Sequence, residues 1–369
     1  MYYFRYRQPF TAFLLLIFVL TKTVPFMKIV IDDKIPYIRE AAALVADEVV
    51  YIAGTEFTPE IIHDADALIV RTRTRCDKKL LEGSKVKFIA TATIGFDHID
   101  YDYCKEAGIC WANAPGSNSS SVAQYIQSAL LMWKKTRHTD LNKLTLGIVG
   151  VGNVGKKIAE IAHRLGMEVL LNDPPRAEKE GASDFVSLQE IAEKSDVITF
   201  HVPLYIGGRF NTHHLADRSF FAMLCKQPTI INTSRGEVID TDELLNAMNS
   251  NIVSDVIIDV WENEPQINRL LLDKAFISTP HIAGYSADGK ANATRMSLDS
   301  ICDFFHLNKA YQISLPAPAA QVQHYESKEE EILNSYNPSQ DSDRLKEHPE
   351  LFEYFRGNYP IRREISALL

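Results

Sequence analysis

Cysteine is scarce in this sequence of 369 residues, and its placement excludes the structures that cysteines usually build. The five cysteines are odd in number, lie far apart and include no Cys-x-x-Cys pair. We therefore expect neither a disulfide framework nor a zinc site. Reduced thiols of this kind are typical of a cytoplasmic protein, which is the location we expect. The five residues are Cys76, Cys104, Cys110, Cys225 and Cys302.

Positive charge is also in short supply. The chain has 39 Lys and Arg residues against 48 Asp and Glu residues, which gives a formal net charge of -9. Nucleic acids and anionic membranes are bound by basic surfaces, so this balance argues against both as partners. A small anionic substrate is compatible with the sequence only if the site gathers its own positive charge.

The chain has no apolar run long enough to span a bilayer, which takes about 20 residues. Arg5 and Arg7 precede an apolar run from Phe13 to Leu20, but no small-x-small cleavage site follows. Residues 27–32 then have the pattern of a buried strand. We expect residues 1–26 to be a leader outside the fold, with Met27 as the true start. An export signal is the alternative interpretation.

The spacing of apolar runs predicts two consecutive parallel α/β sheets. A chain of this length exceeds one ordinary core, so at least two domains are expected. Short β-rich runs alternate with helical stretches, which is typical of βαβ units. The first series predicts strands at 28–31, 67–71 and 87–91 and a helix around 37–46. The second predicts strands at 146–149, 168–172, 197–200, 229–232, 256–260 and 275–278.

Three further segments connect or follow these sheets. Residues 119–135 have helical periodicity and are expected to join the two series. A second helix is expected at 287–305 and would return the chain to the first sheet. Leu315-Pro316-Ala317-Pro318 then interrupts regular structure. Residues 321–369 are polar and rich in Glu and Lys, and we expect a small helical appendage there.

A glycine-rich turn marks the start of the second series. Gly150, Gly152 and Gly155 form a Gly-x-Gly-x-x-Gly motif between an expected strand and an expected helix at 156–165. The motif alone is weak evidence, but this context is the one a dinucleotide-binding Rossmann fold requires. The first glycine permits the turn, the second lets the backbone approach a pyrophosphate, and the third allows close helix packing.

Asp173 follows the next expected strand and indicates which dinucleotide binds. A carboxylate there accepts hydrogen bonds from the adenosine ribose hydroxyls and repels a 2′-phosphate, so NAD is favoured over NADP. Arg176, three residues later, could bind the 2′-phosphate of NADP. We therefore expect NAD as the cofactor, with a strong but not absolute preference.

Three polar residues follow separate strands of the second series and together suit the oxidation of a hydroxy acid. The guanidinium of Arg235 suits bidentate hydrogen bonding to the substrate carboxylate. His281 suits the base, because imidazole titrates near neutrality at about pH 6.5. Glu264 suits the group that orients the imidazole. His201 also follows a strand and, from chemistry alone, is a competing base.

The motifs GVGNVG, HVPL, INTSRG, DVWENEP and PHIAGY, in this order, resemble those of the D-isomer-specific 2-hydroxyacid dehydrogenases. The resemblance covers residues 27–318 well and residues 336–364 more loosely. Within the family, the segments 71–74, 90–98, 172–176 and 281–290 are most similar to a member that oxidises a phosphorylated hydroxy acid in vitamin B6 synthesis. Another member acting on glycerate, hydroxypyruvate or 3-phosphoglycerate is one alternative. A NAD-sensing scaffold like the related corepressors is another.

The resemblance implies an α/β architecture in which a Rossmann dinucleotide-binding domain is inserted in a flavodoxin-like substrate domain. The substrate domain would comprise residues 27–120 and 284–316, and the NAD-binding domain residues 121–283. Residues 317–369 would form a small C-terminal dimerisation segment of a homodimer. This segment is shorter than is usual in the family, which puts the details of dimerisation in doubt.

The resemblance also implies the functional residues. It assigns Arg235, Glu264 and His281 as the catalytic set, and it is the reason His281 is preferred to His201. Substrate contacts are implied for Thr72, Thr93 and Tyr285. Cofactor contacts are implied for Gly150, Gly152, Asn153, Val154, Gly155, Asp173, Val202, Thr233, Ser234, Arg235, Asp259, Gly284 and Tyr285. Val202 departs from the family, which often has a threonine there, so a side-chain contact is lost.

A phosphorylated acid brings about three negative charges, and Arg235 is already assigned to the carboxylate. Two groups of arginines are candidates for the phosphate. Arg71 and Arg73 share a face after an expected strand, and Arg75 follows them. The C-terminal segment adds Arg356, Arg362 and Arg363, which we expect to supply charge as well as a dimer contact. The alternative is that these arginines balance the acidic run 329–331.

Overall fold

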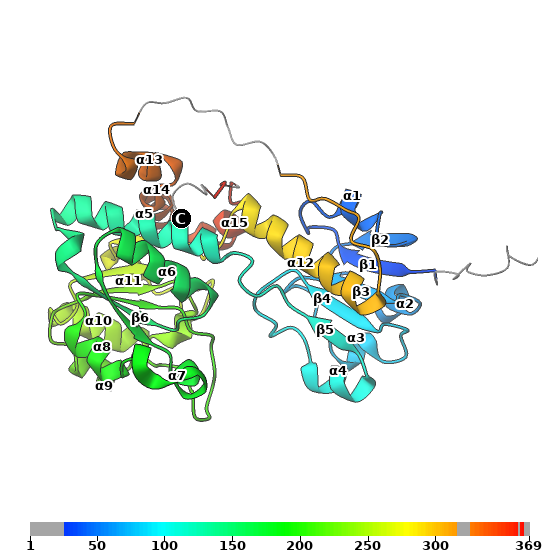
Figure 1. Ribbon diagram of the computed structural model, residues 1–369, viewed down its shortest axis with the longest axis horizontal. Helices are drawn as coiled ribbons and strands as arrows, with labels where there is room; N and C mark the ends of the chain where they lie inside the picture. The colour runs from blue at the N-terminus through cyan, green and yellow to red at the C-terminus, as the bar shows by residue number, and fades with distance from the viewer. Residues whose placement is uncertain (1–25, 316–324, 361, 365–369) are drawn as a thin grey trace, which may run out of the picture.

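The computed structural model describes residues 26–315, 325–360 and 362–364, and this part of the chain forms two parallel sheets in two lobes (Figure 1). Nearly all of the expected leader lies outside the described residues. The first residue of the first strand, Lys28, follows soon after the described part begins. No helix in the described ranges is both long and apolar enough to cross a membrane.

The first sheet has the strand order β2-β1-β3-β4-β5. All its strands pair in parallel, which is the flavodoxin-like doubly wound arrangement. Its strands are β1 (Lys28–Asp32), β2 (Glu48–Ile52), β3 (Ala67–Val70), β4 (Phe88–Thr91) and β5 (Cys110–Ala112). The helices that connect them are α1 (Arg39–Ala42), α2 (Pro59–Ile62), α3 (Lys78–Leu81) and α4 (Tyr101–Ala107).

Two edge strands of this sheet, β2 and β5, were not predicted. Every residue of β2 is only half-buried, and β5 has three residues, so neither shows the strong apolar pattern of a central strand. The helix expected around 37–46 is confined to the four residues of α1. The central strands were recognisable because they are buried on both faces.

The second sheet has the order β11-β10-β9-β8-β6-β7. Its strands are β6 (Thr145–Val149), β7 (Glu168–Asn172), β8 (Val197–Phe200), β9 (Thr229–Asn232), β10 (Asp255–Ile258) and β11 (Ile277–Ser278). Its helices include α6 (Asn153–Arg164), α7 (Pro174–Glu180), α8 (Leu188–Lys194), α9 (Arg218–Ala222), α10 (Thr241–Asn249) and α11 (Arg269–Lys274). Strand order reverses between β6 and β8, and this switch point is where open α/β sheets bind ligands.

Two long helices join the lobes, as expected. Helix α5 (Ser119–Arg137) carries the chain into the second lobe, and α12 (Ala287–Phe305) carries it back to pack on β4 (Figure 1). The two helices also contact each other. The second sheet is thus inserted in the chain between two parts of the first lobe, as expected. The exact domain boundaries stay a prediction.

The C-terminal segment packs on the second lobe of its own chain. It contains α13 (Lys328–Ser335), α14 (Pro338–Glu347) and α15 (Phe352–Gly357). Ile332 and Tyr336 belong to one buried apolar cluster of that lobe, and Leu345 and Phe352 belong to the other. The segment is therefore part of the fold of a single chain, whatever further contacts it makes.

Candidate active site

The glycine-rich turn after β6 is shaped by contacts that only glycine allows. Gly150 has a positive φ of 90°, and a Cβ there would lie 2.7 Å from the backbone of His201. A Cβ on Gly155 would clash with the carbonyl oxygen of Gly150. A Cβ on Gly152, in contrast, would meet no atom within 4 Å. The first and third glycines therefore serve packing, whereas the second faces open space.

That open space adjoins the first turn of α6. Gly152 is the N-cap of this helix, and no side chain caps it. The N–H groups of the first turn are thus not used by a capping side chain and can donate to an anion. The helix dipole also favours negative charge at this end. Asn153 lies at the start of the helix and packs against Gly116, which lies in the segment between β5 and α5. The turn fits the pyrophosphate of a dinucleotide.

Asp173 stands at the end of β7, beside the glycine turn. Its Oδ2 accepts a hydrogen bond from the N–H of Val151 at 2.8 Å, and its Oδ1 caps α7 through the N–H of Arg176. Arg176 is held by Glu180 and by the carbonyl oxygen of Val151. Because the Arg176 guanidinium already makes these hydrogen bonds, it is poorly placed to bind the 2′-phosphate of NADP.

The loops after β8 and β9 flank the turn. Val202, half-buried, reaches the space that a Cβ on Gly150 would occupy. Ser234 donates through both its N–H and its hydroxyl to Asn232 Oδ1, which fixes the loop that carries Arg235. The hydroxyl of Thr233 lies 3.5 Å from His201 Nδ1. These residues surround the glycine turn as expected, but their cofactor contacts stay a prediction.

His281 and Glu264 form the central pair of the site. His281 Nδ1 lies 2.9 Å from Glu264 Oε2 and 3.2 Å from Oε1. Glu264 Oε1 also accepts a hydrogen bond from the backbone N–H of Trp261 at 3.0 Å. A carboxylate at Nδ1 places the ring proton there, so Nε2 keeps the lone pair that can accept a proton.

The ionised state of Glu264 is favoured by its surroundings. Burial on its own raises the pKa of this carboxyl, but the hydrogen bond and charge of His281, the N–H of Trp261 and the charge of Arg356 outweigh it. The pKa of Glu264 is therefore below the usual range. The site holds an anion beside the imidazole at neutral pH.

The loop that carries His281 is fixed by Asp259. This buried carboxylate accepts hydrogen bonds from the N–H groups of Ile282 and Ala283 and from the hydroxyl of Thr279. His281 itself adopts a left-handed backbone conformation with φ of 56°, which is uncommon for a residue other than glycine. Asp259 was expected to contact the cofactor, yet in the structure both of its oxygens hold this loop.

Gly284 ends the same loop under a packing constraint. A Cβ on Gly284 would come 2.1 Å from Asn118 Nδ2, at the point where α5 leaves the first lobe. The loop can approach this connection only because residue 284 has no side chain. Gly284 therefore brings the two lobes together at the site.

Arg235 faces the first lobe. A Cβ on Gly95 would lie 2.9 Å from Arg235 Nη2, so the guanidinium packs against the loop after β4. Thr93 shapes that loop by donating its hydroxyl to the carbonyl oxygen of Gly95 at 2.8 Å. Thr72 is exposed in the neighbouring loop after β3. Arg235 and Thr93 are thus brought together at the loop after β4, whereas the role of Thr72 stays a prediction.

His201 has the wrong environment for a base. Its Nε2 lies 2.9 Å from the hydroxyl of Thr199, and burial lowers the pKa of its imidazole to about 3. A ring with so low a pKa is neutral at physiological pH and accepts a proton poorly. The geometry favours His281, which agrees with the preference drawn from the family pattern.

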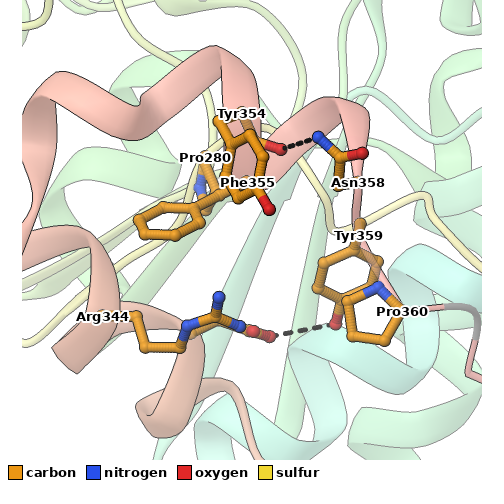
Figure 2. A pocket seen from close by; sticks show the side chains of 8 residues that line it. Pro280, Arg344, Tyr354, Phe355, Asn358, Tyr359 and Pro360 are labelled. Atoms are coloured by element: carbon orange, nitrogen blue, oxygen red, sulfur yellow. Dashed lines mark hydrogen bonds between the residues drawn. The ribbon is translucent and has the colours of Figure 1, made fainter.

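The C-terminal segment reaches this site, and this contact was not predicted in detail. Arg356 Nη1 of α15 lies 3.5 Å from Glu264 Oε2, and the charge of Arg356 also interacts with the Tyr285 side chain. Nearby, α14, α15 and the loop 358–360 enclose a small pocket against Pro280, the residue before His281 (Figure 2). Asn358 donates to the carbonyl oxygen of Tyr354, and Tyr359 donates to Asp341 (Figure 2).

Most of the arginines considered for a substrate phosphate are engaged elsewhere. Arg362 is bonded to carbonyl oxygens of Ser121, Ile282 and Ala283. The other pairs are Arg363 with Asp288, Arg73 with Glu353, and Arg71 with Asp32. Arg75 donates to the carbonyl oxygen of Asp97. Arg356 is the member of the group nearest to the catalytic pair.

Comparisons with known proteins agree with this geometry. Residues 120–283 match the family model described as "D-isomer specific 2-hydroxyacid dehydrogenase, NAD binding domain". The chain is 65% identical over 341 residues to the erythronate-4-phosphate dehydrogenase of Bacteroides thetaiotaomicron, covering 92% of this chain and 98% of the relative. It is 41% identical over 349 residues to the enzyme of the same name from Porphyromonas gingivalis, covering 92% and 94% of the two chains.

Solved structures show the same architecture. The NAD⁺-bound 3-phosphoglycerate dehydrogenase of Entamoeba histolytica superposes with a TM-score of 0.63 at 29% identity, covering 78% of this chain and 98% of the other. The apo D-mandelate dehydrogenase of Rhodotorula graminis gives a TM-score of 0.64 at 25% identity, covering 80% and 99%.

Proposed function

Because the chain belongs to the erythronate-4-phosphate dehydrogenases of the D-isomer-specific 2-hydroxyacid dehydrogenase family, we propose that it oxidises 4-phospho-D-erythronate to 2-oxo-3-hydroxy-4-phosphobutanoate with NAD. The reaction serves the synthesis of pyridoxal 5′-phosphate. The observation that carries this proposal is the pairing of His281 Nδ1 with Glu264 Oε2 at 2.9 Å, in the same lobe as Arg235 and the glycine turn.

Oxidation of the 2-hydroxyl needs a group that removes its proton. His281 does so at Nε2, because Nδ1 is turned toward Glu264. As the imidazole gains the proton, the adjacent carboxylate stabilises the positive charge, and the low pKa of Glu264 keeps it ionised for that role. NAD, when bound, supplies the carbon that accepts the hydride from C2.

Arg235 holds the substrate for this step. Its guanidinium is a planar donor that suits the substrate carboxylate, and its position against Gly95 places that carboxylate at the junction of the two lobes. Thr72 and Thr93 lie in loops on the opposite side. Two-point attachment of this kind fixes C2 between the base and the cofactor.

The glycine turn at Gly152 and the first turn of α6 would hold the pyrophosphate of NAD, and Asp173 would accept hydrogen bonds from the adenosine ribose. The engagement of Arg176 with Glu180 supports NAD over NADP. The full set of expected cofactor residues is retained in this proposal, with Asp259 acting through the loop that it holds.

We also infer a cytoplasmic homodimer. The reaction draws on the cellular NAD pool, and all five cysteines are free thiols. The C-terminal segment leaves Leu351 and Tyr354 exposed, which suits a contact with a second subunit. Sedimentation of a Tyr354→Glu variant tests this contact, since a charge there should favour monomers without uncovering the core.

A substrate panel tests the proposed activity. Purified protein with NAD is assayed with 4-phospho-D-erythronate, D-erythronate, D-glycerate and 3-phosphoglycerate, and NADH formation is followed by absorbance. The expected result is the largest kcat/KM for 4-phospho-D-erythronate. A preference for any other acid, or no turnover beside intact NAD binding, would contradict the proposal.

A further inference from the structure

Two positive charges lie close to Tyr285, which follows His281 by four residues. The ammonium of Lys290 lies 5.2 Å from the centroid of the Tyr285 ring, and the charge of Arg356 interacts with the same side chain. Lys290 belongs to the first two turns of α12, which begins immediately after the His281 loop. The same lysine is close enough to Arg71 for the two charges to repel. Lys290 is thus a cation that has a second cation, Arg71, nearby.

Of the three positive charges Arg356, Arg71 and Lys290, only the first two are paired with a carboxylate in the described part of the chain. Arg356 is paired with Glu264, and Arg71 is paired with the buried Asp32 through its Nε and Nη2 groups at 3.0 Å each. In the described part of the chain, no Asp or Glu oxygen forms an ion pair with Lys290. Burial and the charge of Arg71 both lower the pKa of its ammonium.

An ammonium that is half-buried and next to another cation is costly unless an anion completes the site. The ring of Tyr285 offers only a weak attraction to the charge. The missing partner must therefore be negative and must reach the cleft between the lobes. A ligand with a phosphate group meets both conditions, because its oxygens can accept from more than one cation.

The position of Lys290 matches the shape of the proposed substrate. Its reacting C2 lies at His281 and its C1 carboxylate at Arg235, so the C4 phosphate must extend away from both. Lys290 follows His281 by nine residues and lies over the Tyr285 ring, with Arg71 of the loop after β3 close enough for the two charges to repel. In the sequence Lys290 ends the family-like segment 281–290, but it received no role there, because a Lys in an early turn of a helix is usually solvated.

We propose that Lys290 binds the phosphate of the substrate. This inference rests on the proposed oxidation of a phosphorylated acid. It makes Lys290 the residue by which the enzyme distinguishes a phosphorylated hydroxy acid from its unphosphorylated analogue. Arg356 remains with Glu264 and serves the catalytic pair.

The test compares Lys290→Met, Lys290→Arg and a control, Arg295→Met, with the wild-type enzyme. Methionine keeps the apolar stem over the Tyr285 ring, and Arg295 lies on the same helix, where it hydrogen-bonds Asn292. For each protein, kcat/KM is measured with 4-phospho-D-erythronate and with D-erythronate. Binding of inorganic phosphate to the enzyme–NADH complex is measured by titration calorimetry.

We expect Lys290→Met to lower kcat/KM for the phosphorylated acid about 10- to 100-fold, as for the loss of one charge-assisted hydrogen bond, and to leave D-erythronate within about twofold. Phosphate affinity should fall in parallel, Lys290→Arg should retain most of both, and Arg295→Met should match the wild type. Equal effects on the two acids, or unchanged phosphate binding, would overturn the proposal for Lys290. Absence of wild-type turnover would instead refute the proposed function, and phosphate binding would still decide the role of Lys290.

Discussion

Arg356 Nη1 lies 3.5 Å from Glu264 Oε2, so a residue close to the end of the chain touches the carboxylate that holds His281. The contact makes the C-terminal segment part of the catalytic centre of its own chain. It also explains why the pKa of Glu264 is low even though burial acts to raise it, because Arg356 adds to the effect of His281.

Replacement of Arg356 by Met should shift the acid limb of the kcat/KM profile to higher pH. The positive charge that helps lower the pKa of Glu264 is then absent, so the carboxylate is protonated at a less acidic pH. We expect a shift of about half a unit to one unit, with Arg356→Lys restoring most of it. Steady-state rates from about pH 3.5 to 8 provide the measurement. A lower melting temperature with an unmoved profile would show that Arg356 is only structural.

Replacement of Asp173 by Ala should weaken NAD binding about 10- to 100-fold and narrow the gap to NADP, because a charged acceptor for the ribose hydroxyls is lost. Asp173→Asn separates this effect from capping, since the amide oxygen can still accept from Arg176. NADH and NADPH titrations followed by fluorescence give the dissociation constants. Equal wild-type affinity for the two cofactors would remove Asp173 from cofactor selection.

His201 should make the protein less stable in mild acid. Its folded-state pKa is about 3, whereas an unfolded histidine titrates near ~6.5, so between these values the unfolded chain binds more protons. The free energy of unfolding should therefore decrease as the pH falls below ~6.5, by about 1.4 kcal/mol per pH unit from this group. Urea unfolding of wild type and His201→Asn at several pH values measures the difference. Parallel curves between pH 4 and 7 would contradict it.

Arg362 should be a major source of stability for the C-terminal segment. Its guanidinium is bonded to three carbonyl oxygens and to Gln124. Arg362→Met leaves these acceptors without a donor and should cost about 3–5 kcal/mol in the free energy of unfolding. Arg344→Met, an exposed arginine over the Phe355 ring, is the matched control and should cost less than about 1 kcal/mol. Equal losses for the two variants in urea unfolding would show that Arg362 has no special role.

The sequence predicts buried elements better than edges and contacts. β8 and β9 begin and end where expected, because strands covered on both faces read as uninterrupted apolar runs. β7 also begins and ends where expected, although it is a partly buried edge strand. β2 is a half-buried edge strand and was missed. The catalytic residues were identifiable because each follows a strand within a recognisable motif.

Contacts that depend on tertiary packing were not visible in the same way. Nothing near Glu264 in the sequence points to Arg356, since the contact exists only once α15 has packed on the second lobe. Asp259 was expected at the cofactor, but its hydrogen bonds to the loop of His281 depend on the relative position of two strand ends. The charge imbalance at Lys290 likewise appears only when Arg71 and Tyr285 are seen beside it.

The most direct test of the account is the turnover of His281→Asn with 4-phospho-D-erythronate, measured beside its NADH dissociation constant. The variant keeps a side chain that can hydrogen-bond Glu264 but has no group that accepts the hydroxyl proton. We predict that kcat falls by about 10²- to 10⁴-fold, while NADH affinity stays within about twofold of the wild type. Near-normal turnover of His281→Asn, together with a loss of that size in His201→Asn, would contradict the assignment of the base.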